Sequence, residues 1–231
     1  MIPKTPKDLL LDIFVEVPAL LEDLDAVLAC TDSSRIPSLR EDITRRCWLL
    51  ETQLLTWREE VDLADPEQPT CTVADPSPSP ALDLIATAHI LCLYWSMFII
   101  IYSTLRAASP EGTTPPTALP VHADPRIYCR RIAEVVSILL HPDAGAYGVH
   151  LANFPTAIAL LCLNATTRDG DGEPEEKRMI LETLRRSSNG RTTGRFVTST
   201  QKQDLRFDRP AAGDDGLKTP SMIARSWLGL R

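Results

Sequence analysis

A run of 22 residues without a formal charge, from Leu84 to Leu105, constrains the fold more than any other feature of the sequence. The run is long enough to cross a membrane as one helix. A helix that is apolar on all sides is also what the centre of an all-helical domain requires. Polar side chains within the run, such as His89 and Ser96, and the lack of a second apolar segment of this length favour the soluble interpretation. We therefore expect an all-α fold around a central apolar helix at about residues 82–107, with a membrane anchor at 84–105 as the alternative.

Glycine and proline indicate how such helices are connected. The chain of 231 residues has 10 glycines and 19 prolines, and no glycine precedes Gly112. The first half therefore contains no glycine-rich phosphate loop and no Asn-Gly or Asp-Gly hairpin turn. Prolines cluster at 64–80 and 109–123, which we interpret as loops. The expected architecture is an irregular, orthogonal multi-helix bundle with proline-rich loops.

The clearest helical pattern runs from residue 39 to residue 61. Ser38-Leu-Arg-Glu41 has the form of a capping box, which predicts that the helix begins there. Apolar residues then recur at steps of three and four, forming a narrow seam of Leu39, Ile43, Cys47, Leu50, Leu54, Trp57 and Val61. We expect this seam to pack inside the chain; the alternative is self-association of two copies through the 39–61 helix.

Capping signals predict the helices that follow the second proline-rich connection. Asp124-Pro125 has the form of an N-cap and a first helical residue, and His141-Pro142 is expected to end that helix. We expect a turn at 143–148 and a short apolar helix at about 155–163.

The distribution of charge divides the chain into two parts. Residues 1–167 carry 11 basic and 21 acidic side chains, a net charge of −10, whereas residues 168–231 carry 13 and 10, a net charge of +3. We expect an acidic all-helical domain at 1–167. A linker, one charged helix at 174–187 closed by Asn189-Gly190, and a weakly basic, largely flexible tail should follow.

No motif in the sequence predicts a catalytic reaction. The chain lacks a Gly-x-Ser-x-Gly elbow, a His-Glu-x-x-His pair, a P-loop and a dinucleotide fingerprint. Its six cysteines are far apart, at positions 30, 47, 71, 92, 129 and 162, and form no Cys-x-x-Cys pair. We therefore predict no enzyme activity, no metal site and no cofactor. The N-terminus has no clean apolar signal core, which favours an intracellular, reducing location.

A polar and aromatic stripe on the central helix is the first candidate site. His89, Tyr94, Trp95 and Tyr102 are placed to line a small-molecule pocket between helices. The alternative is that they are ordinary core residues, because aromatic stripes on buried helices pack the interior of many proteins.

A basic segment is the second candidate site. Arginines that predict a contact surface for an acidic partner are Arg185, Arg186, Arg191 and Arg195. The alternative is a solvated tail. Ser187 and Ser188 follow two arginines and match a basophilic kinase site, where phosphate at a helix C-terminus would destabilise that end.

Four segments resemble one family. They are Arg46-Cys-Trp-Leu-Leu-Glu-Thr-Gln-Leu-Leu-Thr-Trp57, Leu93-Tyr-Trp95 through Tyr102-Ser-Thr-Leu105, Tyr128-Cys-Arg-Arg-Ile-Ala133 leading into His141-Pro-Asp-Ala-Gly-Ala-Tyr-Gly148, and Gly194-Arg-Phe196. In this order, over about residues 10–200, they resemble the C-terminal helical regulatory region of fungal zinc-cluster (Zn2Cys6) transcription factors.

The resemblance implies an all-helical regulatory domain in the nucleus that controls transcription through contacts with other regulatory proteins. Those factors bind DNA through six closely spaced cysteines, and none of those ligands has a counterpart here. The chain would then be a truncated or a stand-alone regulatory domain. Its acidic body would repel a phosphate backbone, so direct DNA binding by this chain alone is not expected. The alternatives are a membrane-attached accessory protein anchored by 84–105 and a small-molecule-sensing domain; without the resemblance, a cytoplasmic location is expected.

Overall fold

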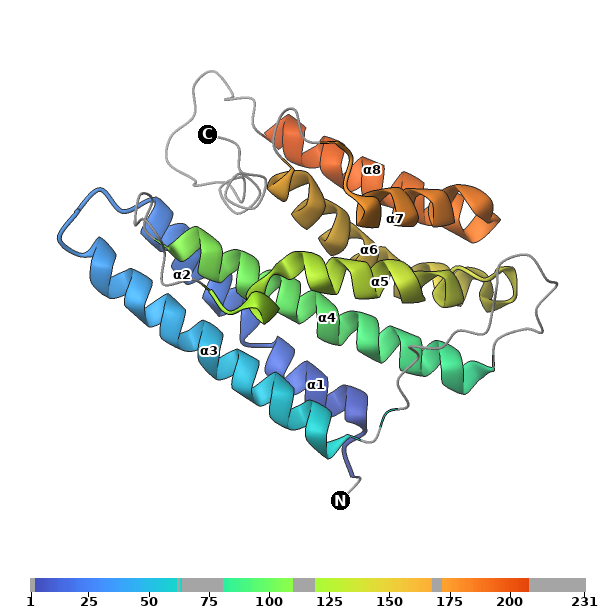
Figure 1. Ribbon diagram of the computed structural model, residues 1–231, viewed down its shortest axis with the longest axis horizontal. Coiled ribbons are helices and arrows are strands. Elements are labelled where there is room, and N and C mark those ends of the chain that lie inside the picture. The colour runs from blue at the N-terminus through green and yellow to red at the C-terminus, as the bar shows by residue number, and fades with distance from the viewer. Residues whose placement is uncertain (1–2, 62, 64–80, 110–118, 168–171, 208–231) are drawn as a thin grey trace.

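The computed structural model describes residues 3–61, 63, 81–109, 119–167 and 172–207 (Figure 1). Within these ranges the chain is all-α and contains no strand. Its elements are α1 (Pro6–Phe14), α2 (Val17–Leu28), α3 (Ile36–Glu60), α4 (Leu82–Ala108), the short 3-10 helix η1 (Val121–Ala123), α5 (Pro125–Leu139), the 3-10 helix η2 (Pro142–Ala144), α6 (Gly145–Thr166), α7 (Glu175–Arg186) and α8 (Ser188–Phe207).

Helix α4 is the centre of the bundle. Every residue from Leu91 to Tyr102 is buried, so this part of the helix is enclosed on all sides. Helices α1, α2, α3, α5 and α6 all pack against it. An isolated helix with this composition would expose apolar side chains on all sides, and the surrounding helices remove that surface from water. The prediction of an all-α multi-helix bundle around a central apolar helix is confirmed.

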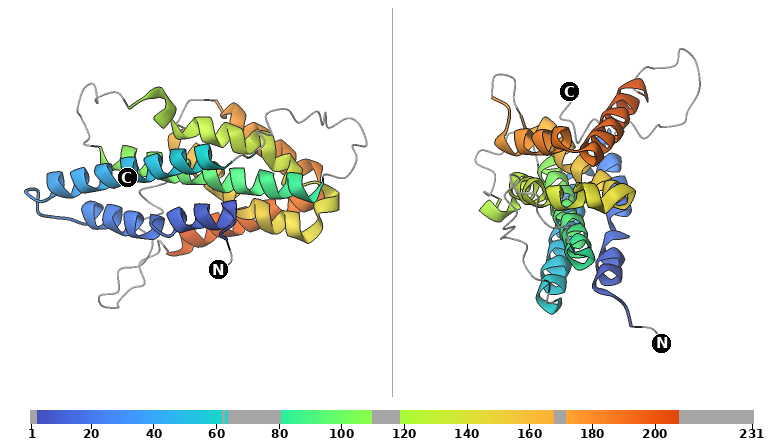
Figure 2. Two further views of the ribbon diagram at one scale, coloured as in Figure 1. Left: turned by 90° about the horizontal axis from the view of Figure 1, so that it is seen from below. Right: turned by 90° about the vertical axis from the view of Figure 1, so that its right-hand side faces the viewer.

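The remaining helices form layers around α4. Helices α1 and α2 follow one another along α3, as the two further views show (Figure 2). On the opposite side, α5 and α6 cover α4, and α7 and α8 lie outside them, at the top of Figure 1. The outermost pair therefore rests on α5 and α6 and forms a second layer above the core.

The apolar seam of α3 packs inside the chain. Ile43, Cys47 and Leu54 are at most 1% exposed, and the seam faces α1, α2 and α4. The indole Nε1 of Trp57 donates a hydrogen bond to the carbonyl of Pro6, 3.0 Å away, and fixes the start of α1 on the end of α3. The seam residues from Ile43 to Val61 are buried within the chain, whereas Leu39 is partly buried.

Of the two predicted helix caps, one is wrong and the other is confirmed. The Ser38–Glu41 capping box is wrong, because α3 begins at Ile36 and has Pro37 in its first turn, without a side-chain cap. Proline supplies the helical φ angle there and lacks the N–H that a cap would satisfy. The predicted cap of α5 is confirmed: the carboxylate of Asp124 accepts from the backbone N–H of Arg126 at 3.1 Å.

Helix α6 is longer than the sequence predicts. The expected turn at 143–148 and short helix at 155–163 are one helix, Gly145–Thr166, with Pro155 inside it. Two described helical segments are long and apolar enough to cross a membrane. They are α4 and the segment Pro142–Thr166, which contains η2 and α6. In α4, 72% of the most apolar window is buried inside the bundle, as the core helix of a soluble protein would be.

The structure also differs from the prediction after residue 187. The charged helix predicted at 174–187 is present as α7, but Asn189-Gly190 does not end it; these residues belong to the first turn of α8. Helix α8 occupies part of the segment predicted to be a largely flexible tail, and it packs against α6 and α7. Residues 208–231 of the predicted tail, and the proline clusters at 64–80 and 110–118, lie outside the described residues.

At Gly148, helix α6 passes close to the end of α5. A Cβ atom built at this residue would lie 2.0 Å from the carbonyl oxygen of Leu139, which is backbone and cannot rotate away. We predict that Gly148→Ala lowers the free energy of unfolding by about 2–3 kcal/mol, the usual cost of overpacking a tight core.

Gly194, in α8, is the matched control for this prediction. A Cβ atom there would meet Leu184 at an ordinary distance of 3.9 Å, so Gly194→Ala should stabilise the helix by about 0.5–1 kcal/mol. Urea unfolding of both variants checks the two signs. A neutral Gly148→Ala variant would contradict the close packing of α5 on α6.

Candidate functional site

Two of the four predicted pocket residues are part of a packed aromatic cluster. The ring of Tyr94 lies 5.3 Å from Trp57 and 5.0 Å from Phe98, measured between centroids. Phe98 stacks on Tyr128 at 4.7 Å, and Tyr102 lies 5.7 Å from Tyr128. The rings therefore fill the interface of α3, α4 and α5 instead of lining an empty space, which is the core interpretation of the stripe.

A buried carboxylate closes one end of the aromatic cluster. The hydroxyl of Tyr102 donates to Oε1 of Glu51 at 2.7 Å, and Nε2 of His122 lies 3.0 Å from the same oxygen. The side chain of Glu51 is only 10% exposed, so its oxygen needs these partners. Burial, together with the hydrogen bond to Glu51, raises the pKa of the Tyr102 hydroxyl well above its usual range. These contacts connect η1 and α3 to α4.

The other two pocket candidates lie on different faces of α4. His89 is 9% exposed; its electrostatic neighbours are Lys7 and His150, on α1 and α6. Trp95 is 8% exposed. None of the four residues lines the cavity between α6, α7 and α8 or the cavity beside η1. The four residues thus do not converge on one pocket.

The lowered pKa of His89 predicts that the folded state becomes less stable in mild acid. Burial, and to a smaller extent Lys7 and His150, lower the pKa of His89 from 6.5 to about 4. The unfolded chain therefore binds one more proton than the folded chain between these values, and the folded state loses stability as the pH falls. From this residue alone, we expect the free energy of unfolding to fall by about 2 kcal/mol between pH 7.5 and pH 5.

The variant His89→Leu should remove this part of the pH dependence, as measured by urea unfolding at both pH values. His150→Gln is the matched control, because His150 is an exposed histidine on α6. An unchanged acid sensitivity in His89→Leu would contradict the prediction.

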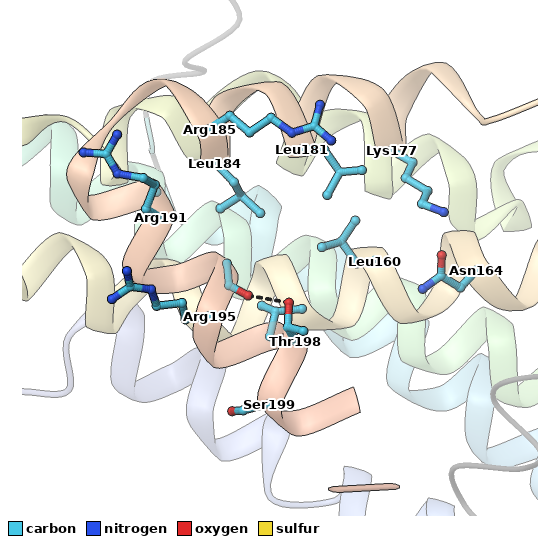
Figure 3. A pocket seen from close by; sticks show the side chains of 13 residues that line it. Leu160, Asn164, Lys177, Leu181, Leu184, Arg185, Arg191, Arg195, Thr198 and Ser199 are labelled. Atoms are coloured by element: carbon cyan, nitrogen blue, oxygen red, sulfur yellow. Dashed lines mark hydrogen bonds between the residues drawn. The ribbon is translucent and has the colours of Figure 1, made fainter. Parts of the chain in front are cut away.

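The structure does form a groove between α6, α7 and α8, with a volume of about 730 Å³ (Figure 3). Its apolar floor comes from all three helices and consists of Leu160, Leu181, Leu184 and Val197. Leu181 and Leu184 point from α7 towards Leu160 of α6, as Figure 3 shows. We call this cavity the basic groove, because of the side chains along its rim.

The rim of the basic groove is positively charged. It carries Lys177, Arg185, Arg191 and Arg195, and none of its described lining residues is acidic. In Figure 3, Arg191 and Arg195 lie towards one end and Lys177 beside Asn164 towards the other. Three of the four predicted contact arginines thus line one groove. The fourth, Arg186, does not line it and instead pairs with Glu182 on the outside of α7.

The three groove arginines have no counter-charge of their own. Arg185, Arg191 and Arg195 are exposed and make no ion pair with any described residue. Lys177, by contrast, lies 3.7 Å from Glu173. Exposed guanidinium groups without an ion pair can bind an anion from another molecule. They stand out on a chain whose first 167 residues carry a net charge of −10.

A tight connection between α7 and α8 fixes the geometry of the groove. The Oγ of Ser187 accepts a hydrogen bond of 2.8 Å from the backbone N–H of Gly190, which is the N-cap interaction of α8. A Cβ atom at Gly190 would lie 2.6 Å from the carbonyl oxygen of Leu184, so glycine permits this close turn. Asn189 also donates to the carbonyl of His141 at 2.8 Å, which ties the start of α8 to the corner between α5 and α6.

This connection changes the interpretation of the predicted phosphorylation site. Ser187 ends α7 but caps α8, and Ser188 is the first residue of α8. A phosphate on Ser188 would thus face the N-terminus of a helix, where negative charge is favourable, and not only the C-terminus of α7. The oxygen of Ser187 is already used as a cap and is only partly accessible.

We predict that Ser187→Ala lowers the free energy of unfolding by about 1 kcal/mol, because the N–H of Gly190 loses its partner. Ser188→Ala is the matched control and should be neutral or slightly stabilising, since alanine is the better helix former. Urea unfolding followed by far-UV circular dichroism compares the two. Equal stability of both variants would show that Ser187 does not cap α8.

Three of the buried thiols have a raised pKa. Burial raises the pKa of Cys47 and of Cys92 to about 12. A hydrogen bond with Cys162, together with burial, raises the pKa of Cys129 as well. Thiols with a raised pKa are poor nucleophiles. The same hydrogen bond lowers the pKa of its partner Cys162. Among the described residues, no three histidine, cysteine, aspartate or glutamate side chains are grouped so that they could hold a metal ion.

Comparisons with protein-family models, with curated proteins and with solved structures found no match. The resemblance to zinc-cluster transcription factors therefore depends on the four ordered segments of the sequence alone. These segments lie in α3, α4, α5, η2 and the start of α6, and α8.

Proposed function

We propose that this chain is a helical regulatory domain of the transcription-factor type that acts in the nucleus by binding other proteins and has no catalytic site of its own. Two lines of reasoning support the proposal. The first is the ordered resemblance of four segments to the regulatory region of fungal zinc-cluster factors. The second is the basic groove, whose rim arginines have no partner within the described chain.

The groove is the observation that carries the proposal. An apolar floor surrounded by cations can hold one face of a protein segment and pair with charges on its flanks. The aromatic cluster, by contrast, is filled, and its carboxylate is hydrogen-bonded. A nucleic acid is a poor partner for this chain alone, because the acidic helices of residues 1–167 repel a phosphate backbone.

A reporter assay tests the proposal. We predict that the full chain, fused to an inert DNA-binding domain, changes reporter transcription by about threefold or more and is enriched in the nucleus. Arg191→Glu with Arg195→Glu should abolish the change, because it reverses the charge of the rim.

Arg178→Glu with Arg186→Glu is the matched control, since it alters net charge equally on exposed residues of α7 that do not line the groove. A wild-type fusion that reaches the nucleus but leaves transcription unchanged would contradict the proposed function. Equal loss in both double variants would show that net charge, and not the groove, is responsible.

A membrane-attached role is the second candidate, because α4 and α6 are each long and apolar enough to span a bilayer. In that state α4 would have to leave the five helices that pack on it, and the polar side chains of those helices would meet lipid or lose their apolar cover. Recovery of the chain in carbonate-resistant membranes would favour this candidate over the nuclear one.

A further inference from the structure

The basic groove has the length of two helical turns. Its lining residues extend from Lys177 to Arg185 on α7 and from Arg191 to Ser199 on α8. At a rise of 1.5 Å per residue, each wall is about 12 Å long. A partner helix of about eight residues covers the same length and presents its positions i, i+3 or i+4, and i+7 on one face.

The side chains of the groove determine which residue types a partner helix must have on its contact face and beside it. The floor is aliphatic on all three sides, with Leu160 from α6, Leu184 from α7 and Val197 from α8, so it excludes charged anchors. The rim offers guanidinium groups from α7 and α8, each able to bind a carboxylate with two parallel hydrogen bonds. Apolar anchors flanked by carboxylates satisfy both requirements.

We infer that the basic groove binds a short, acidic amphipathic helix of a partner protein, with two or three apolar side chains on the floor and its carboxylates on Arg185, Arg191 and Arg195. The inference rests on the proposed function and adds the chemical class of the partner. Charge complementarity is what selects this occupant: no described residue neutralises the three arginines, and the groove lining contributes no acidic side chain.

The occupant is a helix rather than an extended strand because the groove lies between helices. No sheet edge is present among the described residues to pair with an extended backbone, so a bound segment must satisfy its own N–H and C=O groups. A helix does this internally and leaves only side chains to be recognised.

The test is binding of a designed peptide by the full chain. The probe is a fluorescein-labelled peptide of 12 residues with leucine at positions that form one helical face and glutamate elsewhere. Its comparison peptides are a scramble of the same composition and a version with lysine in place of glutamate. We expect the acidic amphipathic peptide to bind about tenfold more tightly than either, and less tightly as salt is raised.

Variants of the rim locate the site. Arg191→Glu with Arg195→Glu should weaken peptide binding about tenfold or more, whereas Arg178→Glu with Arg186→Glu should change it less than about twofold. All four positions are exposed, so the fold should survive, and circular dichroism and urea unfolding check this. Equal binding of the scrambled peptide, or equal loss in both double variants, would overturn the inference.

Other anions are outcomes of the same experiment. A double-stranded DNA oligonucleotide or pyrophosphate that binds more tightly than the peptide, and competes with it, would overturn the inference in favour of a phosphate site. Protein that regulates the reporter but does not bind the peptide would overturn the inference and leave the proposed function standing. Protein that binds the peptide but leaves transcription unchanged would overturn the proposed function and leave the inferred peptide site standing.

Discussion

The enclosure of α4 on all sides is the constraint on which the structure depends. A helix whose residues from Leu91 to Tyr102 are all buried has no solvent face of its own, so the rest of the chain must supply a complete cover. Helices α1, α2 and α3 supply one side of that cover and α5 and α6 the other. Each of these helices therefore needs one apolar face towards α4 and is free to vary on its other faces.

The position of the basic groove follows from the same constraint. Because α5 and α6 are occupied with α4 on one face, their outer faces are available for α7 and α8. These two helices bury Leu160 of α6, and its side chain lies with those of Leu181, Leu184 and Val197 at the floor of the groove. The arginines lie on the outer rim, where charged side chains remain in water.

Sequence reasoning could predict the parts of the fold that local signals control. The uncharged run gave α4, the steps of three and four gave the buried face of α3, and Asp124-Pro125 gave the start of α5. Predictions from the sequence were wrong where tertiary packing determines the extent of a helix. Pro155 suggests a helix break, yet α6 continues through it because its neighbours pack on both halves. Helix α8 has glycine and several β-branched residues, which are poor helix formers, and it is held by the buried residues Thr193 and Val197.

The candidate site shows the same division. The cluster of arginines at 185–195 was visible as charge, and three of its four members line the groove. Composition alone could not show that Arg185 lines the groove and Arg186 does not. A step of one residue turns a helix by about 100°, which places the two side chains on different faces. The floor could not be predicted, because it exists only once α8 is folded against α6. The candidate stripe of His89, Tyr94, Trp95 and Tyr102 is buried in the bundle, and whether its members share one pocket depends on how the neighbouring helices pack on α4.

The outer position of α7 and α8 has a consequence for how the chain opens. These two helices pack on α5 and α6 and on one another, so they can detach without uncovering the core helix. They form a natural cooperative unit whose local unfolding requires less free energy than global unfolding. A partner bound in the groove bridges α6, α7 and α8, and its binding energy is therefore added first to this unit. Occupancy of the groove would decide whether α7 and α8 are a permanent part of the bundle or a segment that folds onto it when a partner is present.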